Sequence, residues 1–568
     1  MINYPALKST NTLLPAISVA LLLFCNNALA QRTAINYDST REGKLVFHNI
    51  KTDSKGNIIP WLSPDLGKSF DDVIHRTWHF WDTMKVDLNG LPYYMNHQVW
   101  RDKTNDPRGL GGDQLQMAMS AWQLLYMYTG NERVKENMKF LADYYLTHSL
   151  SPSNAVWPNI PFPYNSLLYS GYYDGDMVIG KNYTQPDKAG SLAWELLKLY
   201  KICGANGFPH ATEKVYMEHV ILIANTLAKH TQVGDFENSP LPFKVNAITG
   251  EVGTITKWLP GGVKGTAKSS YTANWTATLQ VFQELIKRKE GDTQTYQKAF
   301  DAILSWMKTY PLKNNRWGPF FEDIPVWSDT QINAITFAKF MMENPELFPN
   351  WKVEVKGIFD WVHKNLGDKT WAKYGVEVMC EQTAYKVPGN SHTARQSAVE
   401  LMYAKLSGDT TWKPNAIRGL SWATYSVAKD GKNNYPRDEI WLTDGYGDFI
   451  RHYLVAFAAC PELAPDFANH ILQSTSVLTQ VDYAPDINKR LAQDTDNEQL
   501  KTIQIFYRSH DEQATETIRL TKKPEKILVS EKLLKESTNL KENGWVWKPM
   551  KVGGLLQIKH SGTDVKIF

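Results

Sequence analysis

The sequence is poor in cysteine. It has 4 cysteines, and Cys25 lies beside an apolar run near the N-terminus, which leaves Cys203, Cys380 and Cys460. Three widely spaced cysteines do not make a disulfide framework, so we expect them to be buried small hydrophobic residues. No C-x-x-C pair is present and nothing in the spacing indicates a zinc site, so we expect no metal and no cofactor.

The chain also lacks a large excess of charge of either sign. The chain has 62 basic and 59 acidic residues, a formal net charge of +3, and no long basic run. Nucleic-acid-binding proteins usually carry a basic patch or stripe, so the composition argues against a nucleic-acid partner. The length of 568 residues allows one large domain and a smaller one.

Only one long apolar run is present, and it lies near the N-terminus. Lys8 precedes the run Leu13 to Phe24, and Ala28-Leu29-Ala30 stands before Gln31. This is the pattern of a signal peptide cleaved after Ala30, and it predicts a secreted or periplasmic protein. The run is too short to span a bilayer. Lipid attachment at Cys25 is a less favoured alternative, because the small residues that usually precede a lipidated cysteine are absent.

Helical hairpins recur along the chain. Thr129-Gly130-Asn131-Glu132, Glu290-Gly291-Asp292-Thr293 and Ser407-Gly408-Asp409-Thr410 are three versions of one turn, in which glycine ends a helix and Asn or Asp caps the next. Asn390-Ser391 is a further pair of cap candidates. Apolar residues at helical spacing predict helices over 64–86, 113–129, 131–149, 187–202, 212–230, 272–289, 293–309, 329–343, 351–366, 391–407, 411–427 and 444–459.

Short and long connectors alternate between these helices. The long ones are 87–112, 150–186, 231–271, 310–328, 367–390 and 428–443. If the hairpins pack side by side, all short turns lie at one end and all long connectors at the other. We therefore predict a mainly α fold, an (α/α)6 toroid of six helical hairpins, whose inner helices follow the long connectors. Long connectors in a compact domain are usually functional, so we expect the site among them.

After Pro461 short alternating runs replace the helices. Five such runs predict the strands of a small C-terminal β module: Thr502 to Tyr507, Thr517 to Leu520, Ile527 to Val529, Trp545 to Trp547 and Leu555 to Ile558. We accordingly divide the chain into a signal peptide (1–30), an N-terminal segment (31–63), a toroid catalytic domain (64–460) and a β-rich module (461–568).

Aromatic residues are abundant in the long connectors. The chain has 20 tryptophans and 27 tyrosines. Aromatic faces pack on the C–H faces of sugars, while amides bind hydroxyl groups and arginine binds a uronate carboxylate. This combination predicts a carbohydrate substrate. The candidate substrate-binding residues are Tyr94, His97, Trp100, Trp157, Tyr173, Trp258, Trp317, Tyr385, His392, Arg395, Arg437 and Trp441.

Carboxylates accompany the aromatic residues. Glycoside hydrolysis needs two carboxyl groups, one protonated and one ionised. We expect Glu381 to be the acid, because the apolar residues before it favour the protonated form. Its partner is expected to be Glu322, Asp323 or Asp174. Each also has a structural interpretation: Glu381 can hold His392 or Arg395, and Asp174 can belong to a turn.

Two other classes of function stay open. A polysaccharide lyase removes the proton next to a uronate carboxylate with Tyr or His as base, and Asn96-His97 and Asn390-Ser391-His392 would suit that reaction. A non-catalytic glycan-binding protein would use the same aromatic surface, and the fold alone does not exclude it. The oligomeric state is not indicated by the sequence.

Two motifs, Tyr374 to Gln382 and Trp441 to Arg451, together with the doubled helices, resemble the six-hairpin (α/α)6-toroid glycosidases and polysaccharide lyases. The resemblance covers roughly residues 64–460. The whole chain is similar to secreted bacterial β-glucuronidase-type glycoside hydrolases. This resemblance implies an enzyme that degrades acidic polysaccharides or oligosaccharides, exo-acting on terminal glucuronic acid. It assigns no catalytic residue, because no single catalytic signature is matched.

Overall fold

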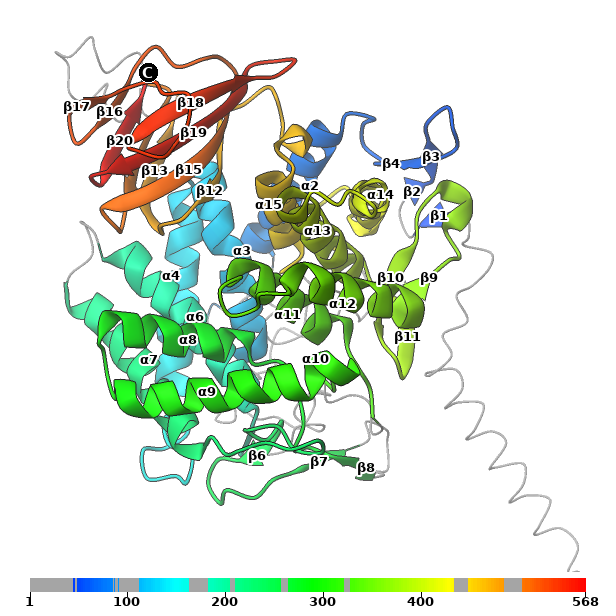
Figure 1. Ribbon diagram of the computed structural model, residues 1–568, viewed down its shortest axis with the longest axis vertical. Coiled ribbons are helices and arrows are strands. Elements are labelled where there is room, and N and C mark those ends of the chain that lie inside the picture. Colours follow the sequence, from blue (N-terminus) through cyan, green and yellow to red (C-terminus); the bar gives the residue numbers. More distant parts are fainter. Residues whose placement is uncertain are drawn as a thin grey trace, which may run out of the picture.

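The computed structural model describes residues 44–45, 48–84, 86, 90, 112–162, 182–204, 210–256, 264–320, 327–433, 448–484 and 503–568. These residues form a helical body followed by a C-terminal β module (Figure 1). The expected fold class, mainly α with a small β module at the C-terminus, is confirmed. No helix in these ranges combines the length and the apolar character that crossing a membrane requires.

Six helices form a closed inner ring within the described ranges. Each contacts the next, and the last contacts the first. All six follow a long connector, as predicted. Small residues allow the close packing: a Cβ added to Gly190 would collide with the Thr278 side chain of the neighbouring helix. The inner helices are α3 (Gly112–Thr129), α6 (Pro186–Cys203), α8 (Thr276–Arg288), α11 (Gln331–Glu343), α13 (Asn390–Ser407) and α15 (Phe449–Ala459).

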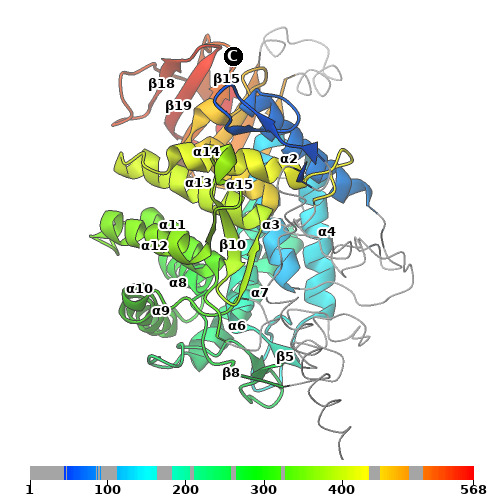
Figure 2. The ribbon, with the colours of Figure 1, turned by 90° about the vertical axis from the view of Figure 1, so that its right-hand side faces the viewer.

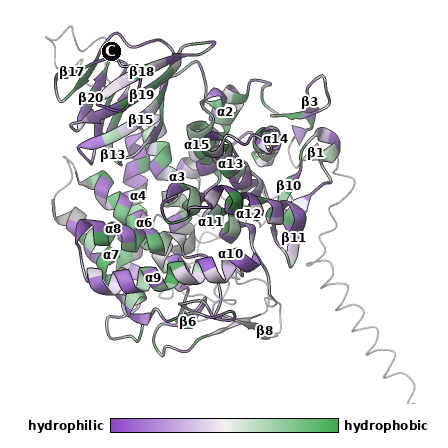
Figure 3. Cartoon of the chain, viewed as in Figure 1, coloured by the Kyte–Doolittle hydropathy of each residue, from purple (hydrophilic) through white to green (hydrophobic). Residues whose placement is uncertain are grey.

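An outer helix packs against each inner one. The outer helices are amphipathic: α9 buries Tyr296, Phe300, Ile303 and Met307, which are spaced three or four residues apart, and Figure 3 shows its hydrophilic and hydrophobic sides. The outer helices are α2 (Leu66–Thr83), α4 (Glu132–His148), α7 (His210–His230), α9 (Thr293–Thr309), α12 (Trp351–Leu366) and α14 (Lys413–Ala423). A short helix, α10 (Pro311–Asn314), follows α9 and was not predicted.

The predicted caps hold at two of the repeated turns. The side chains of Asn131 and Asp292 accept hydrogen bonds from the first turns of α4 and α9. Gly408 ends α13 with φ +85, a conformation that favours glycine.

Two other cap predictions are wrong. Asp409 accepts from Thr411 N at 2.9 Å, but α14 begins only at Lys413 and has no side-chain cap. The helix α13 begins at Asn390 itself, with Gly389 as its uncapped N-cap residue. The Asn390 amide instead donates to Asn433 Oδ1 at 2.5 Å, which ties the helix start to another connector.

The inner helices begin at a common end of the ring, which we call the mouth. Hydrogen bonds join the starts of neighbouring inner helices. Asn274 Nδ2, just before α8, donates to Asp187 Oδ2 at the start of α6 at 2.8 Å. Arg395 of α13 donates to Gln331 of α11 at 3.0 Å and to Asp448 before α15 at 2.6 Å. The connectors that enter the inner helices therefore meet at the mouth.

Short strands lie in these connectors. Three of them, β9 to β11, form one small sheet beside α11 and α13. The connector strands are β5 (Tyr183–Thr184), β6 (Val245–Asn246), β7 (Thr254–Thr256), β8 (Lys264–Lys268), β9 (Gly367–Asp368), β10 (Val378–Gln382) and β11 (Tyr385–Pro388).

The described part of the N-terminal segment packs on the helical body. The Trp61 indole donates to Thr424 O at 2.9 Å, and the Tyr425 hydroxyl donates to Ile59 O at 2.8 Å. Its strands are β1 (Lys44–Leu45), β2 (His48–Asn49), β3 (Lys51–Thr52) and β4 (Ile58–Ile59).

The C-terminal module consists of two antiparallel sheets that share one hydrophobic core. Their orders are β12-β15-β19-β18 and β13-β14-β20-β16-β17. The strands are β12 (His470–Ser474), β13 (Leu478–Tyr483), β14 (Ile505–Ser509), β15 (Gln513–Leu520), β16 (Ile527–Val529), β17 (Lys532–Leu534), β18 (Gly544–Pro549), β19 (Gly554–Ser561) and β20 (Asp564–Ile567).

The module docks where the inner helices end. Tyr483 Oη donates to Met127 O of α3 at 2.7 Å, and β12 and β13 also contact α15 and α6. Figures 1 and 2 show the module and the connector strands β5 to β8 at opposite ends of the molecule. The division of the chain into four units stays a prediction, although the change from helices to strands falls between Ala459 and His470.

Candidate functional site

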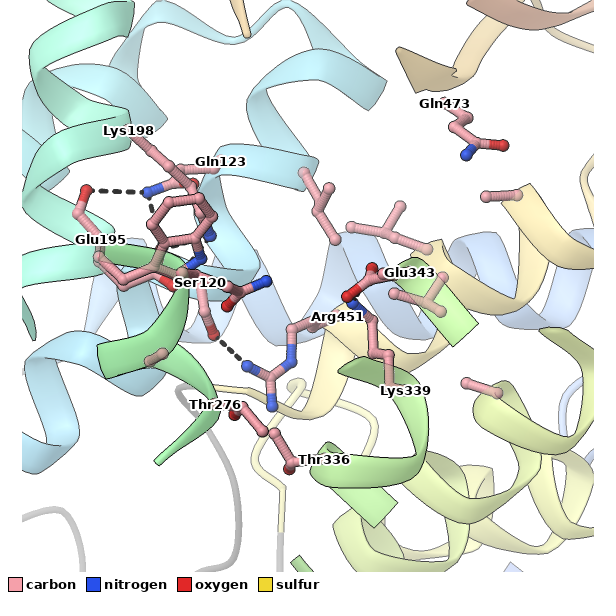
Figure 4. A pocket seen from close by; sticks show the side chains of 18 of the residues that line it. Ser120, Gln123, Glu195, Lys198, Thr276, Thr336, Lys339, Glu343, Arg451 and Gln473 are labelled. Atoms are coloured by element: carbon pink, nitrogen blue, oxygen red, sulfur yellow. Dashed lines mark hydrogen bonds and ion pairs between the residues drawn. The ribbon is translucent and has the colours of Figure 1, made fainter. Parts of the chain in front are cut away.

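A cavity of about 690 Å³ lies inside the inner ring. All six inner helices line it, and residues 472–478, which join the end of β12 to the start of β13, line the part nearest the module. A hollow of this size suits a small saccharide, because ligand pockets typically span roughly 300–1,000 Å³. Figure 4 shows polar side chains entering the cavity from several helices.

Arg451 of α15 extends into this cavity. Its Nη1 donates to Ser120 Oγ of α3 at 2.6 Å, and its Nη2 donates to Asp448 Oδ2 at 3.0 Å. Its side chain remains 27% exposed. Thr276 of α8 and Thr336 of α11 line the same cavity (Figure 4). Hydrogen-bond donors and hydroxyl groups from four helices therefore face one space.

Asp448 holds the arginine side chains together. Arg395 Nη2 donates to Asp448 Oδ2 at 2.6 Å, and Ser391 Oγ donates to Asp448 Oδ1 at 2.8 Å. The Asp448 side chain is 1% exposed. Burial opposes its ionisation, but the charge of Arg395 and the contact with His452 outweigh burial and hold the pKa of the Asp448 carboxyl well below its ordinary value. We call Asp448, Arg395, Arg451, Ser391 and His452 the Asp448 cluster.

The histidines of this region are neutral. Burial lowers the pKa of His452 to about 3, although Asp448 lies 3.3 Å from its Nε2. Burial and the charge of Arg395 also hold the pKa of His392 well below its ordinary value. Two guanidinium groups therefore share one carboxylate, and the cluster carries a net charge of one positive unit. The N-terminal ends of α13 and α15 add partial positive charge, so the cluster favours an anion.

A chain of polar residues holds the Arg395 side chain in place. Gln331 accepts from Arg395 Nη1 at 3.0 Å and donates to Gln396 Oε1 at 3.2 Å. Gln396 donates to Glu400 Oε1 at 2.8 Å, and that oxygen also lies 2.7 Å from His363 Nε2 on α12. This chain of contacts connects the cavity wall to an outer helix.

His363 closes this chain as a cation. Burial opposes its protonation, but the hydrogen bonds with Glu377 and Glu400 outweigh burial and raise the pKa of His363 to about 10. The side chain of Glu400 is fully buried, so the protonated imidazole balances a charge that would otherwise be unpaired inside the protein.

Glu195 of α6 places another carboxylate in the cavity. Its oxygens lie 3.0 and 3.1 Å from Lys198 Nζ, and Gln123 Nε2 donates to Oε2 at 2.8 Å (Figure 4). Burial lowers the pKa of Lys198, and Glu195 opposes that shift. Among the described residues, no group of three or more His, Cys, Asp or Glu is arranged to hold a metal ion.

Sequence reasoning missed four of these residues. Glu195 and Lys198 lie in the segment 187–202, which the sequence predicts only as a helix. Asp448 and Arg451 lie in the motif Trp441 to Arg451, to which no role was given. The available signal was the position of charged residues on helices predicted to be inner ones.

Glu381 lies at the mouth, on β10. Glu381 is 8% exposed, and Gln382 Nε2 donates a hydrogen bond to its Oε1 at 2.8 Å. Gln382 forms a β-bridge with Thr330, the residue before α11. Tyr385, on β11, is also 8% exposed. The strand therefore carries Glu381 to the start of an inner helix, while its role as the acid stays a prediction.

The two described tryptophans among the predicted sugar platforms are core residues. Trp317 is fully buried, with its ring 6.0 Å from Phe337 and 6.4 Å from Trp361. Trp157 is 4% exposed and stacks on His230 at 4.0 Å. Neither presents a ring face to the cavity. Abundant tryptophan in the connectors predicts a sugar-binding surface, but Trp317 packs between α11 and α12 and Trp157 packs on the last residue of α7.

His392 and Arg395 are both buried at the start of α13, at 3% and 5% exposure, and Arg395 lines the cavity. The other predicted site residues lie outside the described ranges: Asp174, Glu322, Asp323, Tyr94, His97, Trp100, Tyr173, Trp258, Arg437 and Trp441.

Comparison with known proteins gives a distant structural likeness. No protein-family model matches the sequence, and no curated protein matches it. Cellobiose 2-epimerase from Spirochaeta thermophila is similar over 70% of this chain and 98% of its own, at 11% identity and a TM-score of 0.49.

Two other solved structures are similar at lower TM-scores. A family 76 glycoside hydrolase from a bovine Bacteroides thetaiotaomicron strain covers 69% of this chain and 78% of its own, at 10% identity and a TM-score of 0.43. An unsaturated glucuronyl hydrolase specific for heparin covers 70% and 97%, at 10% identity and a TM-score of 0.38. Likeness at this level carries no argument about activity.

Proposed function

We propose that this protein is a carbohydrate-active enzyme that binds an acidic saccharide inside its helical ring. One observation carries the proposal: Arg395 and Arg451 line the cavity and share a single buried carboxylate, Asp448. A buried excess of positive charge is costly unless an anion or a dipole balances it. A uronate carboxylate would supply that anion.

Arg451 is the residue best placed to bind the carboxylate. Ser120 and Asp448 fix its orientation, and 27% of its side chain remains accessible. A planar guanidinium that is already oriented binds a carboxylate with two parallel hydrogen bonds. Thr276 and Thr336 would bind sugar hydroxyl groups beside it.

We propose hydrolysis of a terminal glucuronic acid as the reaction. Glu381 would protonate the leaving oxygen, and a second carboxylate would act as base or nucleophile. The partner is proposed among Asp174, Glu322 and Asp323. Glu195 is a further carboxylate of the cavity wall, and its ion pair with Lys198 suits it to binding hydroxyl groups.

β-Elimination is the second candidate, because two imidazoles lie beside Arg395 at the start of α13 and α15. Burial lowers the pKa of His392 and His452, so each has a free ring nitrogen that can accept a proton, and the same burial makes each a weak base. Arg395 beside them would neutralise the uronate carboxylate. The same assay distinguishes the two reactions.

The test is product analysis on an aryl glucuronide and on uronate polymers. We expect new reducing ends without the absorbance of an unsaturated uronate; appearance of that absorbance would replace hydrolysis by elimination. Glu381→Gln should lower the rate by roughly 10²–10⁴-fold, the usual contribution of a general acid. Full activity in Glu381→Gln would remove Glu381 from the acid role, and tight binding without product would indicate a glycan-binding protein.

Arg451→Ala tests the binding half of the proposal. Removing a charged hydrogen-bonding partner of a carboxylate should weaken glucuronate binding by about tenfold or more. Arg451→Lys keeps the charge but not the fork, so it should recover only part of the affinity. Unchanged affinity in Arg451→Ala would contradict the assignment of this cavity.

We also propose that the protein is exported with cleavage after Ala30. The signal-peptide pattern of residues 1–30 supports this. The mass of the protein recovered from the periplasm or medium should correspond to a chain that begins at Gln31, and a chain that retains residues 1–30 there would contradict it.

A further inference from the structure

An exposed aromatic group lies at the mouth, apart from the cavity. Its members are Trp327, Arg316 and Phe236, which we call the rim aromatic group. Trp327 is 37% exposed and Phe236 is 44% exposed. The Arg316 guanidinium carbon lies 3.8 Å from the Trp327 ring centre and 4.4 Å from the Phe236 ring centre. The three side chains therefore form one surface.

Hydrogen bonds hold the Trp327 ring in a fixed orientation. Its Nε1 donates to Asp329 Oδ2 at 2.8 Å. The other oxygen of Asp329 accepts from the backbone of Trp317 and Gly318 at 2.7 and 2.9 Å. Tyr271 makes a T-shaped contact with the indole, with ring centres 4.9 Å apart. An exposed indole that is fixed in this way loses little conformational freedom when a ligand binds.

The turn that carries Phe236 is equally well fixed. Asp235 Oδ1 accepts from Glu237 N at 2.7 Å and from Asn238 N at 2.8 Å. The backbone oxygen of Asp235 accepts from the Trp306 indole at 2.8 Å. Glu237 pairs with Arg316 at 3.2 Å, but it is 61% exposed, so solvent screens this ion pair.

The group is tied to the strand that carries Glu381. Asp329 N donates to Thr383 Oγ1 at 3.0 Å, and Thr383 N donates to Asp329 O at 3.0 Å. Trp327 and Glu381 each lie two residues from this junction. Because an extended residue spans about 3.5 Å, their backbones are no more than about 20 Å apart. One oligosaccharide can therefore reach both.

We infer that the rim aromatic group is a second sugar-binding subsite, at which a pyranose ring of an acidic oligosaccharide stacks on Trp327. This inference rests on the proposed function, because it places a further unit of the same glycan at the same mouth. One face of the indole is covered by the guanidinium, and the rest of the exposed ring is available for the C–H face of a sugar. The substrate is accordingly an oligosaccharide or polymer, not a single glycoside.

Chain-length dependence of binding tests this subsite. Calorimetry would give the affinities of wild-type protein for glucuronic acid and for a tetrasaccharide of linked glucuronate units. We expect the tetrasaccharide to bind at least about tenfold more tightly, since one aromatic contact with its buried area contributes on that order. Trp327→Ala should reduce the ratio of the tetrasaccharide affinity to the glucuronic acid affinity to near one. Trp327→Phe should keep most of this ratio.

Phe140→Ala is the matched control. Phe140 is 43% exposed on the outer helix α4, so its removal should leave the ratio at the wild-type value. A wild-type ratio in Trp327→Ala, or a wild-type protein that binds both ligands equally, would overturn the inference. If the affinity ratio depends on Trp327 but the protein forms no product, the subsite is supported and the proposed enzymatic activity is contradicted.

Discussion

The two ends of the helical ring use charge in opposite ways. At the mouth, Asp448 is 1% exposed and joins residues of two inner helices, α13 and α15. Where the inner helices end, Lys339 and Glu343 form an ion pair within one helix, and their side chains are 33% and 34% exposed. The turns there are also local, since Asn131 and Asp292 cap the helices that they precede.

Lys339 and Glu343 line the same cavity as Arg451, so the difference lies between local ion pairs at one end of the cavity wall and charges shared between helices at the mouth. Exposed pairs within one helix contribute little and are easily replaced. Buried charges shared between helices cost desolvation energy, so their presence at the mouth points to a ligand that uses them. At the other end, strands β12 and β13 of the β module contact the inner helices α3, α6 and α15.

The largest expected effect comes from removing the shared charge. Asp448→Asn leaves two arginines without their carboxylate in a buried site, which should lower the free energy of unfolding by about 3–5 kcal/mol. Glu343→Gln at the other end should change it by less than about 0.5 kcal/mol. Urea unfolding of both variants makes the comparison. Equal effects would show that the two ends do not differ as described.

The next largest effect compares two turns where helices end. The β module contacts the turn at Gly130, whereas the turn at Gly408 is open. Gly130 (φ +65) and Gly408 (φ +85) have similar backbone conformations. A Cβ at position 130 would meet Val481 O of the module at 2.6 Å, whereas nothing lies within 4 Å at position 408. Gly408→Ala should cost about 1–2 kcal/mol for the left-handed conformation.

Gly130→Ala should cost about 1–3 kcal/mol more than Gly408→Ala, because overpacking adds to the conformational cost. Thermal and urea unfolding measure the difference. If the two variants are equally stable, the module is not pressed against this turn.

A smaller effect concerns the pH dependence of stability behind the mouth. The folded-state pKa of His363 is raised to about 10 by Glu377 and Glu400, against an ordinary value near 6.5. Its contribution to stability is therefore complete below about pH 6.5 and is lost as pH rises toward 10. In the wild-type protein, the free energy of unfolding should therefore decrease between about pH 6.5 and pH 10.

His363→Gln removes the titrating group, so the decline between pH 6.5 and 10 should become shallower. Glu400→Gln should have the same effect on the slope, because it removes one of the carboxylates that raise the pKa. Urea unfolding at several pH values measures the slope. An identical slope in wild type and in both variants would show that His363 does not retain its proton.

The helices were predictable because their signal is local. Apolar residues three and four positions apart gave α9 and α12 the bounds that the structure has, 293–309 and 351–366. The strands β12 and β13 were missed because they lack alternation: both have consecutive buried residues, since β12 and β13 contact the inner helices as well as the module core. Burial on two sides removes the period-two pattern.

The site was less predictable because it depends on ring closure. Arg395 and Asp448 are 53 positions apart, and Arg451 and Ser120 are 331 apart. No periodicity connects such residues. Trp317 shows the reverse error, because composition counts an aromatic ring but does not tell whether it faces a cavity or the core.

The most direct test of the account is a crystal structure of the protein with a glucuronate oligosaccharide bound. We expect sugar inside the helical ring, with one carboxylate within about 3.2 Å of the Arg451 guanidinium, the range of a charged hydrogen bond. Sugar bound only on the outer surface, or inside the ring with every carboxylate turned away from Arg451, would contradict the account.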